Sequence, residues 1–372
     1  MNSGSAAAEI LEDEEAVDDI DESREVVPYV YSITAYGADY PVDSLVKRID
    51  SGDIVVPRFS WHDEASEITG FQREYVWPRP KSDRFIESLL LGLPVPGIFL
   101  VREPSGRFLV LDGHQRLHTL QSFYNGQIHD RVFRLAGVEN RFQNKRYEDL
   151  DVADRRRLDD SIIHATVIRQ DAPTEDQSSV YMIFERLNTG GVNLQPQEIR
   201  VALYHGELVR VLRQLNELSA WRNLFGKRSR RLKDMELILR FFAFYYRAGD
   251  YKSPMKEFLN TYMASNKDLE RQGEDELVQI FTDTVTLLDE AVGHNALRPL
   301  RAVNAAVADS VMTGLARRIT SAPIRDASQV AQRYDELLKD RDYQRAIADR
   351  TAHESNVGTR INAATAVFAD VE

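Results

Sequence analysis

The sequence predicts an α+β protein in which a mixed α/β N-terminal domain precedes an all-helical C-terminal domain. Short apolar runs bounded by Gly and Pro, which are typical of strands, are confined to the part before residue 170. From Asp176 onward, apolar residues recur at spacings of three and four, the period of amphipathic helices. The first residues are strongly acidic and carry too little apolar content to fold. We therefore expect a disordered acidic tail at 1–26, the α/β domain at 27–185 and the helical domain at 186–372.

In the α/β domain, apolar runs alternate with capped helical segments. Pro104, Ser105 and Gly106 separate two apolar runs, which predicts a hairpin. Ser82 can cap the helix that follows it, and Gly92 ends that helix. The expected strands are 27–33, 54–57, 97–102, 108–111 and 164–169, the expected helices are 45–50, 82–91 and 114–124, and the polar stretch 59–70 is expected to be a loop.

The C-terminal part shows helical periodicity almost throughout. Leu237, Ile238, Phe241, Phe242 and Tyr245, for example, fall on one face of a helix. The expected helices are 176–187, 195–218, 232–247, 254–264, 274–291, 299–319, 326–337 and 356–369.

Composition excludes several classes of protein. The chain has no cysteine, which rules out disulfides, Cys-ligated zinc, iron–sulfur clusters and a Cys nucleophile. Hydrophobic residues make up 43% and charged residues 28%, as in ordinary soluble proteins. No apolar run approaches the ~18 residues that span a bilayer. We expect a cytoplasmic protein with no membrane partner.

The net charge of -12 is concentrated in the tail. Ten acids and one base, Arg24, lie between Glu9 and Glu25, which gives this segment -9 and leaves -3 for the remainder. The acidity therefore does not argue against a nucleic-acid partner for the body of the protein. The tail either keeps the chain soluble or imitates nucleic acid and competes for a basic groove.

The candidate centre is the segment 112–116, Asp-Gly-His-Gln-Arg, where an expected strand runs directly into an expected helix. The first N–H groups of a helix and its dipole favour phosphate, and Gly113 would let a ligand approach the backbone. Arg116 could grip phosphate oxygens, Asp112 could hold magnesium or orient a water, and His114 could act as a general acid or base. The alternative is a capping turn, in which Asp112 caps the helix and Arg116 forms a salt bridge.

Three other constellations carry polar groups suited to ligands. Gln72 and Arg73 would contact a base and a phosphate; alternatively, Arg73 pairs with an acid, and Tyr75 and Trp77 anchor the core. Asn188, which precedes a two-glycine helix end, would contact a ligand together with Arg186. His114 and His118, four residues apart, could share a metal ion with Asp112, although no zinc-binding motif is present.

A dense basic cluster is a candidate for contact with a nucleic-acid backbone. Trp221 and Phe225 are interleaved with its cations, a composition that suits nucleic acid and equally a solvated loop. Its members are Arg222, Lys227, Arg228, Arg230, Arg231 and Lys233.

Three ordered segments resemble one family, the N-terminal domain of GmrSD-type restriction endonucleases, which SspE-like phage-defence proteins also contain. Segment 71–77, Phe-Gln-Arg-Glu-Tyr-Val-Trp, resembles its F-Q-R-x-x-V-W motif. Segment 89–96, followed by 112–117, is similar to its helix, strand and D-G-Q-Q-R core. Segment 184–191, with 198–200, resembles its F-x-R-L-N-T-x-G region. Residues 231–236 and 240–242 extend the resemblance, which spans about 41–250.

The resemblance implies a ParB/sulfiredoxin-like fold that binds and hydrolyses a nucleotide, coupled to DNA restriction. By position, Asp112, Gly113, Gln115 and Arg116 would form the core of the site, faced by Gln72 and Arg73. The cofactor would be ATP, GTP or CTP with magnesium. This chain departs from the family pattern because His114 replaces a glutamine, His118 stands where Thr is common, and the polar stretch 59–70 interrupts the run before Gln72.

The leading hypothesis is a nucleotide-hydrolysing subunit of a restriction or phage-defence system. Fused family members carry an HNH-type nuclease, and the isolated His294 and His353 do not form that pattern, so we expect a separate nuclease subunit. The rival is a non-enzymatic DNA-binding or adaptor protein with the same fold, and a nuclease that acts alone is a weaker third hypothesis. Sulfiredoxin-type chemistry is excluded because it needs a thiol. Whether the chain forms a homo-oligomer stays open.

Overall fold

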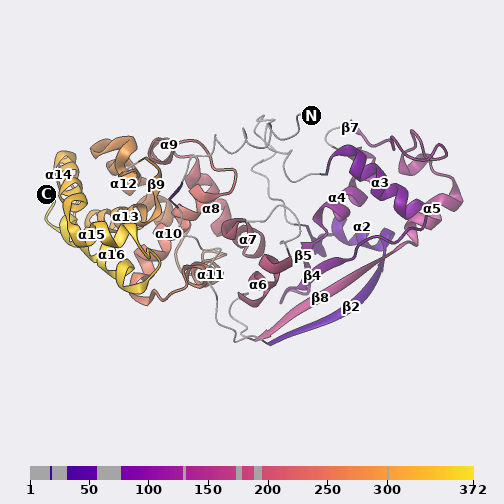
Figure 1. Cartoon of the computed structure of the whole chain (residues 1–372), viewed down its shortest axis with the longest axis horizontal. Coiled ribbons are helices and arrows are strands. Elements are labelled where there is room, and N and C mark those ends of the chain that lie inside the picture. The colour runs from indigo at the N-terminus through magenta and orange to yellow at the C-terminus, as the bar shows by residue number, and fades with distance from the viewer. Residues whose placement is uncertain are drawn as a thin grey trace. The chain divides into compact units, whose positions relative to one another are not determined.

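The computed structural model describes residues 17–18, 32–56, 77–128, 131–172, 178–187, 195–299 and 301–372. These form two compact units, an α/β unit within 30–193 and a helical unit within 194–372, and the described residues Val17 and Asp18 belong to the helical unit. Figure 1 shows the elements of both units. The expected α+β class, with an α/β part followed by a helical part, is confirmed.

The α/β unit is built on a mixed five-stranded sheet in the order β2-β8-β4-β5-β3. Strands β2 and β8 pair antiparallel, β8 and β4 parallel, β4 and β5 antiparallel, and β5 and β3 parallel. The expected hairpin is therefore present, with Leu100 opposite Val110. The strands are β2 Ser32–Pro41, β3 Ile54–Val55, β4 Ile98–Arg102, β5 Phe108–Asp112 and β8 Ile162–Ala172.

Helices complete the core of this unit. Leu45, Ile86 and Phe123, from three different helices, pack with Leu100 and Val110 of the sheet, and all five are buried. Leu109 alternates with Val110 and faces the other side of the sheet, where it is also buried. The helices are α2 Val42–Asp50, α3 Arg79–Leu90, α4 His114–Tyr124, α5 Val152–Asp159 and α6 Ser178–Leu187, and α6 contacts β5 and β8.

The helical unit packs around α13 (Ala305–Ser321). Gly314 of α13 lies so close to α16 (Glu354–Ala369) that an added Cβ would stand 2.7 Å from the Ala364 carbonyl carbon. A strand of two residues, β1 (Val17–Asp18), pairs in parallel with β9 (Val303–Asn304) in the same unit. The helices are α7 Pro196–Leu203, α8 Glu207–Asn216, α9 Ser219–Phe225, α10 Lys233–Arg247, α11 Met255–Ser265, α12 Glu274–Ala291, α13 Ala305–Ser321, α14 Ala327–Lys339, α15 Arg341–Ala348 and α16 Glu354–Ala369.

Several boundaries differ from those expected. The single helix expected at 195–218 is two helices, because Leu208 donates its N–H to the Lys267 carbonyl at 2.9 Å and the chain turns at Gly206. Helix α13 begins at Ala305 rather than 299, because Asn304 caps it by accepting from the Val307 N–H at 3.0 Å. Helices α5, α9 and α15, and the extent of β2 to Pro41, were not expected.

One short antiparallel pair of strands, β6 Gln127–Ile128 and β7 Arg131–Val132, completes the described strands. The described 3-10 helices are η2 Tyr147–Asp149, η4 Ala248–Asp250 and η5 Gly293–Leu297. Within the described part of the chain, no helix has the length and apolar character needed to cross a membrane.

Candidate functional site

The candidate site is the junction between β5 and α4. The strand ends at Asp112, Gly113 adopts φ 103° in the left-handed region, and α4 begins at His114. A Cβ on Gly113 would lie 2.4 Å from Cγ2 of Ile98 on the neighbouring strand. Glycine is therefore required here by backbone conformation and by packing, in addition to the close ligand approach inferred from the sequence.

Asp112 and Arg116 meet at this junction. The Arg116 Nη2 group donates to Asp112 Oδ2 at 2.6 Å and to the Gly97 carbonyl at 3.0 Å. The Arg116 side chain is 13% exposed and that of Asp112 is 45% exposed, so solvent reaches the carboxylate more readily than the guanidinium. Arg116 Nε is buried and has no hydrogen-bond partner in the described part of the structure. The site thus presents one accessible carboxylate beside an arginine that keeps unused donor capacity.

His114 lies at the start of α4 with its ring largely enclosed. Phe184 of α6 stacks on it, with ring centroids 6.1 Å apart and planes inclined by 22°. Burial lowers the pKa of His114 to about 4, and the nearby Asp112 carboxylate opposes this shift only in part. At neutral pH the ring is therefore uncharged, and a protonated, acid-donating His114 is disfavoured.

Gln115 anchors a neighbouring segment. Its Oε1 atom accepts a hydrogen bond from the backbone N–H of Trp77 at 2.8 Å. The Trp77 ring packs edge-on against Phe85 at 5.5 Å, and Lys81 lies over it at 4.6 Å. Gln72 and Arg73 lie outside the described residues, which begin again at Trp77.

Helix α6 carries Arg186, whose side chain is exposed. Residues two apart on a helix do not share a face, so Arg186 points away from the side on which Phe184 meets His114. Asn188 and the two glycines after it lie outside the described residues. The structure therefore links α6 to the site through Phe184, a residue that sequence reasoning used only as part of a motif.

The metal-sharing arrangement considered for His114, His118 and Asp112 has no counterpart in the structure. In the described ranges, no group of three or more His, Asp or Glu side chains could hold a metal ion. His118 is exposed, and its Nδ1 lies 3.4 Å from the Ser122 hydroxyl.

The basic cluster lies in the helical unit, and its members differ in role. Trp221 and Phe225 are fully buried, so these aromatics form core and are closed to stacking on bases. Arg222 is bound internally, to Asp234 at 3.0 Å and to Asn216 at 2.9 Å. Lys227, Arg228 and Arg230 are exposed, although Arg228 also pairs with Glu217, and Arg231 lies 3.5 Å from Glu198.

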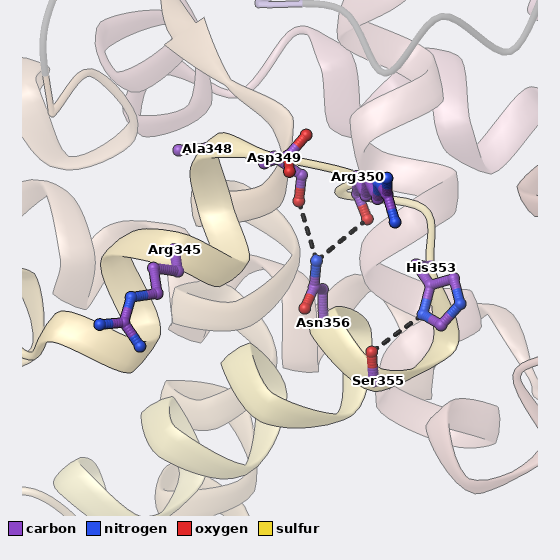
Figure 2. Close-up of a pocket in the computed structure, with 7 residues that line it drawn as sticks. All are labelled: Arg345, Ala348, Asp349, Arg350, His353, Ser355 and Asn356. Atoms are coloured by element: carbon purple, nitrogen blue, oxygen red, sulfur yellow. Dashed lines mark hydrogen bonds between the residues drawn. The ribbon is translucent and has the colours of Figure 1, made fainter.

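A cavity of about 480 Å³ lies elsewhere, at the turn between α15 and α16. Its lining residues are Arg345, Ala348, Asp349, Arg350, His353, Ser355 and Asn356 (Figure 2). Arg345 is paired with Asp342, and Asp349 adds a further negative charge, so the lining is mixed in sign. None of the residues singled out from the sequence as site residues lines this cavity, and we place the candidate site at 112–116 instead.

The junction thus brings the end of a strand, a left-handed glycine and the start of a helix together with the Asp112 carboxylate and the Arg116 guanidinium. Residues 43–205 match the family model described as the GmrSD restriction endonuclease, N-terminal domain. This match confirms, for these residues, the resemblance inferred from the sequence. It indicates a component of a restriction or phage-defence system. Searches of curated proteins and of solved structures found no match.

Proposed function

We propose that this chain is the nucleotide-binding subunit of a DNA restriction or phage-defence system, and that it hydrolyses ATP, GTP or CTP with magnesium. The observation that carries the proposal is the pairing of Asp112 and Arg116 at the N-terminus of α4, within the segment that matches the family. Such a junction concentrates positive potential and free N–H groups where a phosphate can bind.

Nucleotide binding would redistribute the bonds of this pair. The guanidinium of Arg116 would turn from Asp112 to phosphate oxygens, where it can form two parallel hydrogen bonds. The freed carboxylate of Asp112 would then face the magnesium that the phosphates carry, since Mg²⁺ usually takes one or two carboxylates beside phosphate and water. Gln115 would act by holding the Trp77 end of the segment that contains Gln72 and Arg73.

In the same proposal, the helical unit contacts DNA through the exposed part of the basic cluster. Lys227, Arg228 and Arg230 are accessible to a phosphate backbone, with Arg231 and Lys233 beside them. Arg222 would support this loop from inside rather than contact DNA, because Asp234 and Asn216 hold its guanidinium. A separate nuclease subunit would cut the DNA.

The test is release of phosphate from ATP, GTP and CTP with magnesium, with and without DNA, for the wild type and for Arg116→Ala. Arg107→Ala is a matched control, because Arg107 also pairs with an acid four residues away, Glu103, but lies on the hairpin turn. Loss of release with Arg116→Ala and retention with Arg107→Ala would support the proposal. Unchanged nucleotide binding by Arg116→Ala would refute the assignment of Arg116.

A second candidate is a non-enzymatic DNA-binding or adaptor protein that recruits a nuclease. Two observations favour it. Arg116 and Gln115 already form hydrogen bonds within the protein, and the low pKa of His114 leaves its ring uncharged, so the junction is stable without a ligand. Nucleotide binding without phosphate release, under conditions in which Arg116→Ala abolishes binding, would select this second function.

A further inference from the structure

We propose that the acidic N-terminal segment is an internal competitor for DNA, which docks on the helical unit through the pairing of β1 with β9. The proposal deepens the DNA-binding part of the proposed function and rests on it. Val17 pairs with Val303 and Asp18 with Asn304, in parallel, although β9 lies nearly three hundred residues further along the chain.

The strand that receives the segment is firmly held. Val303 is fully buried. Asn304 caps α13 by accepting from the Val307 N–H at 3.0 Å and donates to the Ile347 carbonyl at 3.3 Å. Strand β9 therefore offers a fixed backbone edge, and backbone pairing of this kind gives affinity with little dependence on the side chains of the added strand.

The same region is connected to the basic cluster. Arg298, which is 8% exposed, donates to the carbonyls of Leu224 and Phe225 at the end of α9. The loop that carries Lys227 and Arg228 begins at the next residue, Gly226. Val303 lies five positions after Arg298, so even a fully extended chain would place the start of the paired strand within about 18 Å of that anchor.

Charge identifies the ligand that the segment would imitate. Residues 9–25 carry a net charge of -9, and the paired residues lie in the middle of this run. A polyanion tethered next to a cationic loop competes with an external polyanion at an effective concentration on the order of millimolar. Because the attraction between the acidic segment and the cationic loop is electrostatic, salt should weaken it.

The test compares DNA affinity at low and high salt for the wild type, a chain lacking 1–26, Val17→Pro and Ala8→Pro. Val17→Pro restricts the paired strand and removes an N–H without changing charge, and Ala8→Pro makes the same change in the tail outside the pairing. We expect the deletion and Val17→Pro to raise DNA affinity about tenfold at low salt, with Ala8→Pro unchanged. Equal affinities for all four chains would overturn the proposal, as would an increase for the deletion alone.

A second measurement separates docking from DNA binding. A synthetic peptide of residues 9–25 is titrated into the chain lacking 1–26, alongside the same peptide with Val17→Pro. Peptide binding that is sensitive to salt and weakened by Val17→Pro would support docking. This holds even if no chain binds DNA, and in that case only the DNA-binding part of the proposed function fails. Absence of peptide binding, or equal binding of both peptides, would overturn the docking itself.

Discussion

Gln115 and Trp77 are joined by a hydrogen bond of 2.8 Å, in which the backbone N–H of Trp77 donates to the Gln115 side chain. A residue that the family resemblance places in the core of the site thus has a structural partner 38 positions away. The bond fixes the entry into α3, where the Trp77 ring packs against Phe85. Gln115 is therefore a positioning residue, whatever further contact it makes.

Replacement of Gln115 by Leu should lower the free energy of unfolding by about 1–2 kcal/mol, because it leaves a partly buried N–H without an acceptor. Gln115→Glu keeps an acceptor and should recover most of the loss. The matched control is Gln121→Leu on the same helix, whose bond to Asp50 is exposed and whose loss should cost less than about 0.5 kcal/mol. Denaturant unfolding gives all three values. A Gln115→Leu variant as stable as the control would contradict the positioning role.

Gly113→Ala should be more damaging than Gly106→Ala. Both glycines have φ in the left-handed region, 103° and 88°, so both substitutions carry a strain of about 1 kcal/mol. Only at Gly113 would the added Cβ meet a neighbour, Ile98 Cγ2, whereas nothing lies within 4 Å at Gly106. We expect a further loss of about 1–3 kcal/mol from this overlap. If thermal or denaturant unfolding showed equal losses of unfolding free energy for the two variants, the Ile98 side chain would have to move aside without cost, and the prediction would be wrong.

His114 should make stability depend on pH. Its folded pKa is lowered to about 4 from the usual 6.5, so the unfolded chain binds the proton more readily. The contribution of the uncharged His114 ring to the free energy of unfolding is thus fully present above about pH 6.5 and is lost as the pH falls toward 4. Between pH 7.5 and 5, the wild type should lose about 1–2 kcal/mol more than His114→Gln, which does not titrate. Parallel pH profiles of unfolding free energy for the two proteins would contradict a lowered pKa for His114.

Substitutions of Arg222 and Lys227 should separate an effect on stability from an effect on DNA binding. Arg222→Ala leaves the fully buried carboxylate of Asp234 without its counter-charge and should cost about 3 kcal/mol of stability. Lys227→Ala, at an exposed position, should change stability by less than about 0.5 kcal/mol. If the loop contacts DNA, Lys227→Ala should also reduce the slope of log affinity against log salt by about 1. An unchanged slope would remove Lys227 from the interface.

The sequence was sufficient for the fold class, the hairpin and the start of α4, because each follows from local periodicity and from turn residues such as Gly106. The break between α7 and α8 could not be predicted from the sequence, because the Lys267 carbonyl that accepts the Leu208 N–H lies far along the chain. Strand β1 was missed for the same reason, since its partner is β9.

The candidate site shows the same division. The residues at 112–116 were found from their order along the chain, and the structure places Asp112 and Arg116 in contact. Two features could not be predicted from the sequence, because both depend on contacts between separate elements. Ile98 leaves no room for a Cβ at position 113, and the Phe184 ring stacks on His114. The interleaved Trp221 and Phe225 were misleading, since composition does not distinguish a core aromatic from an exposed one.

The topology of the sheet has a consequence for folding. Strand β2 pairs with β8, so that Pro41 meets Ile162 and Ser32 meets Ala172. During synthesis, β2 leaves the ribosome long before this partner exists, and closing so long a loop delays the pairing. The backbone of this ten-residue strand, in which Ile33 and Tyr36 are exposed, therefore stays unpaired until β8 has been synthesised. An unpaired strand of this kind is prone to pair with another chain and aggregate.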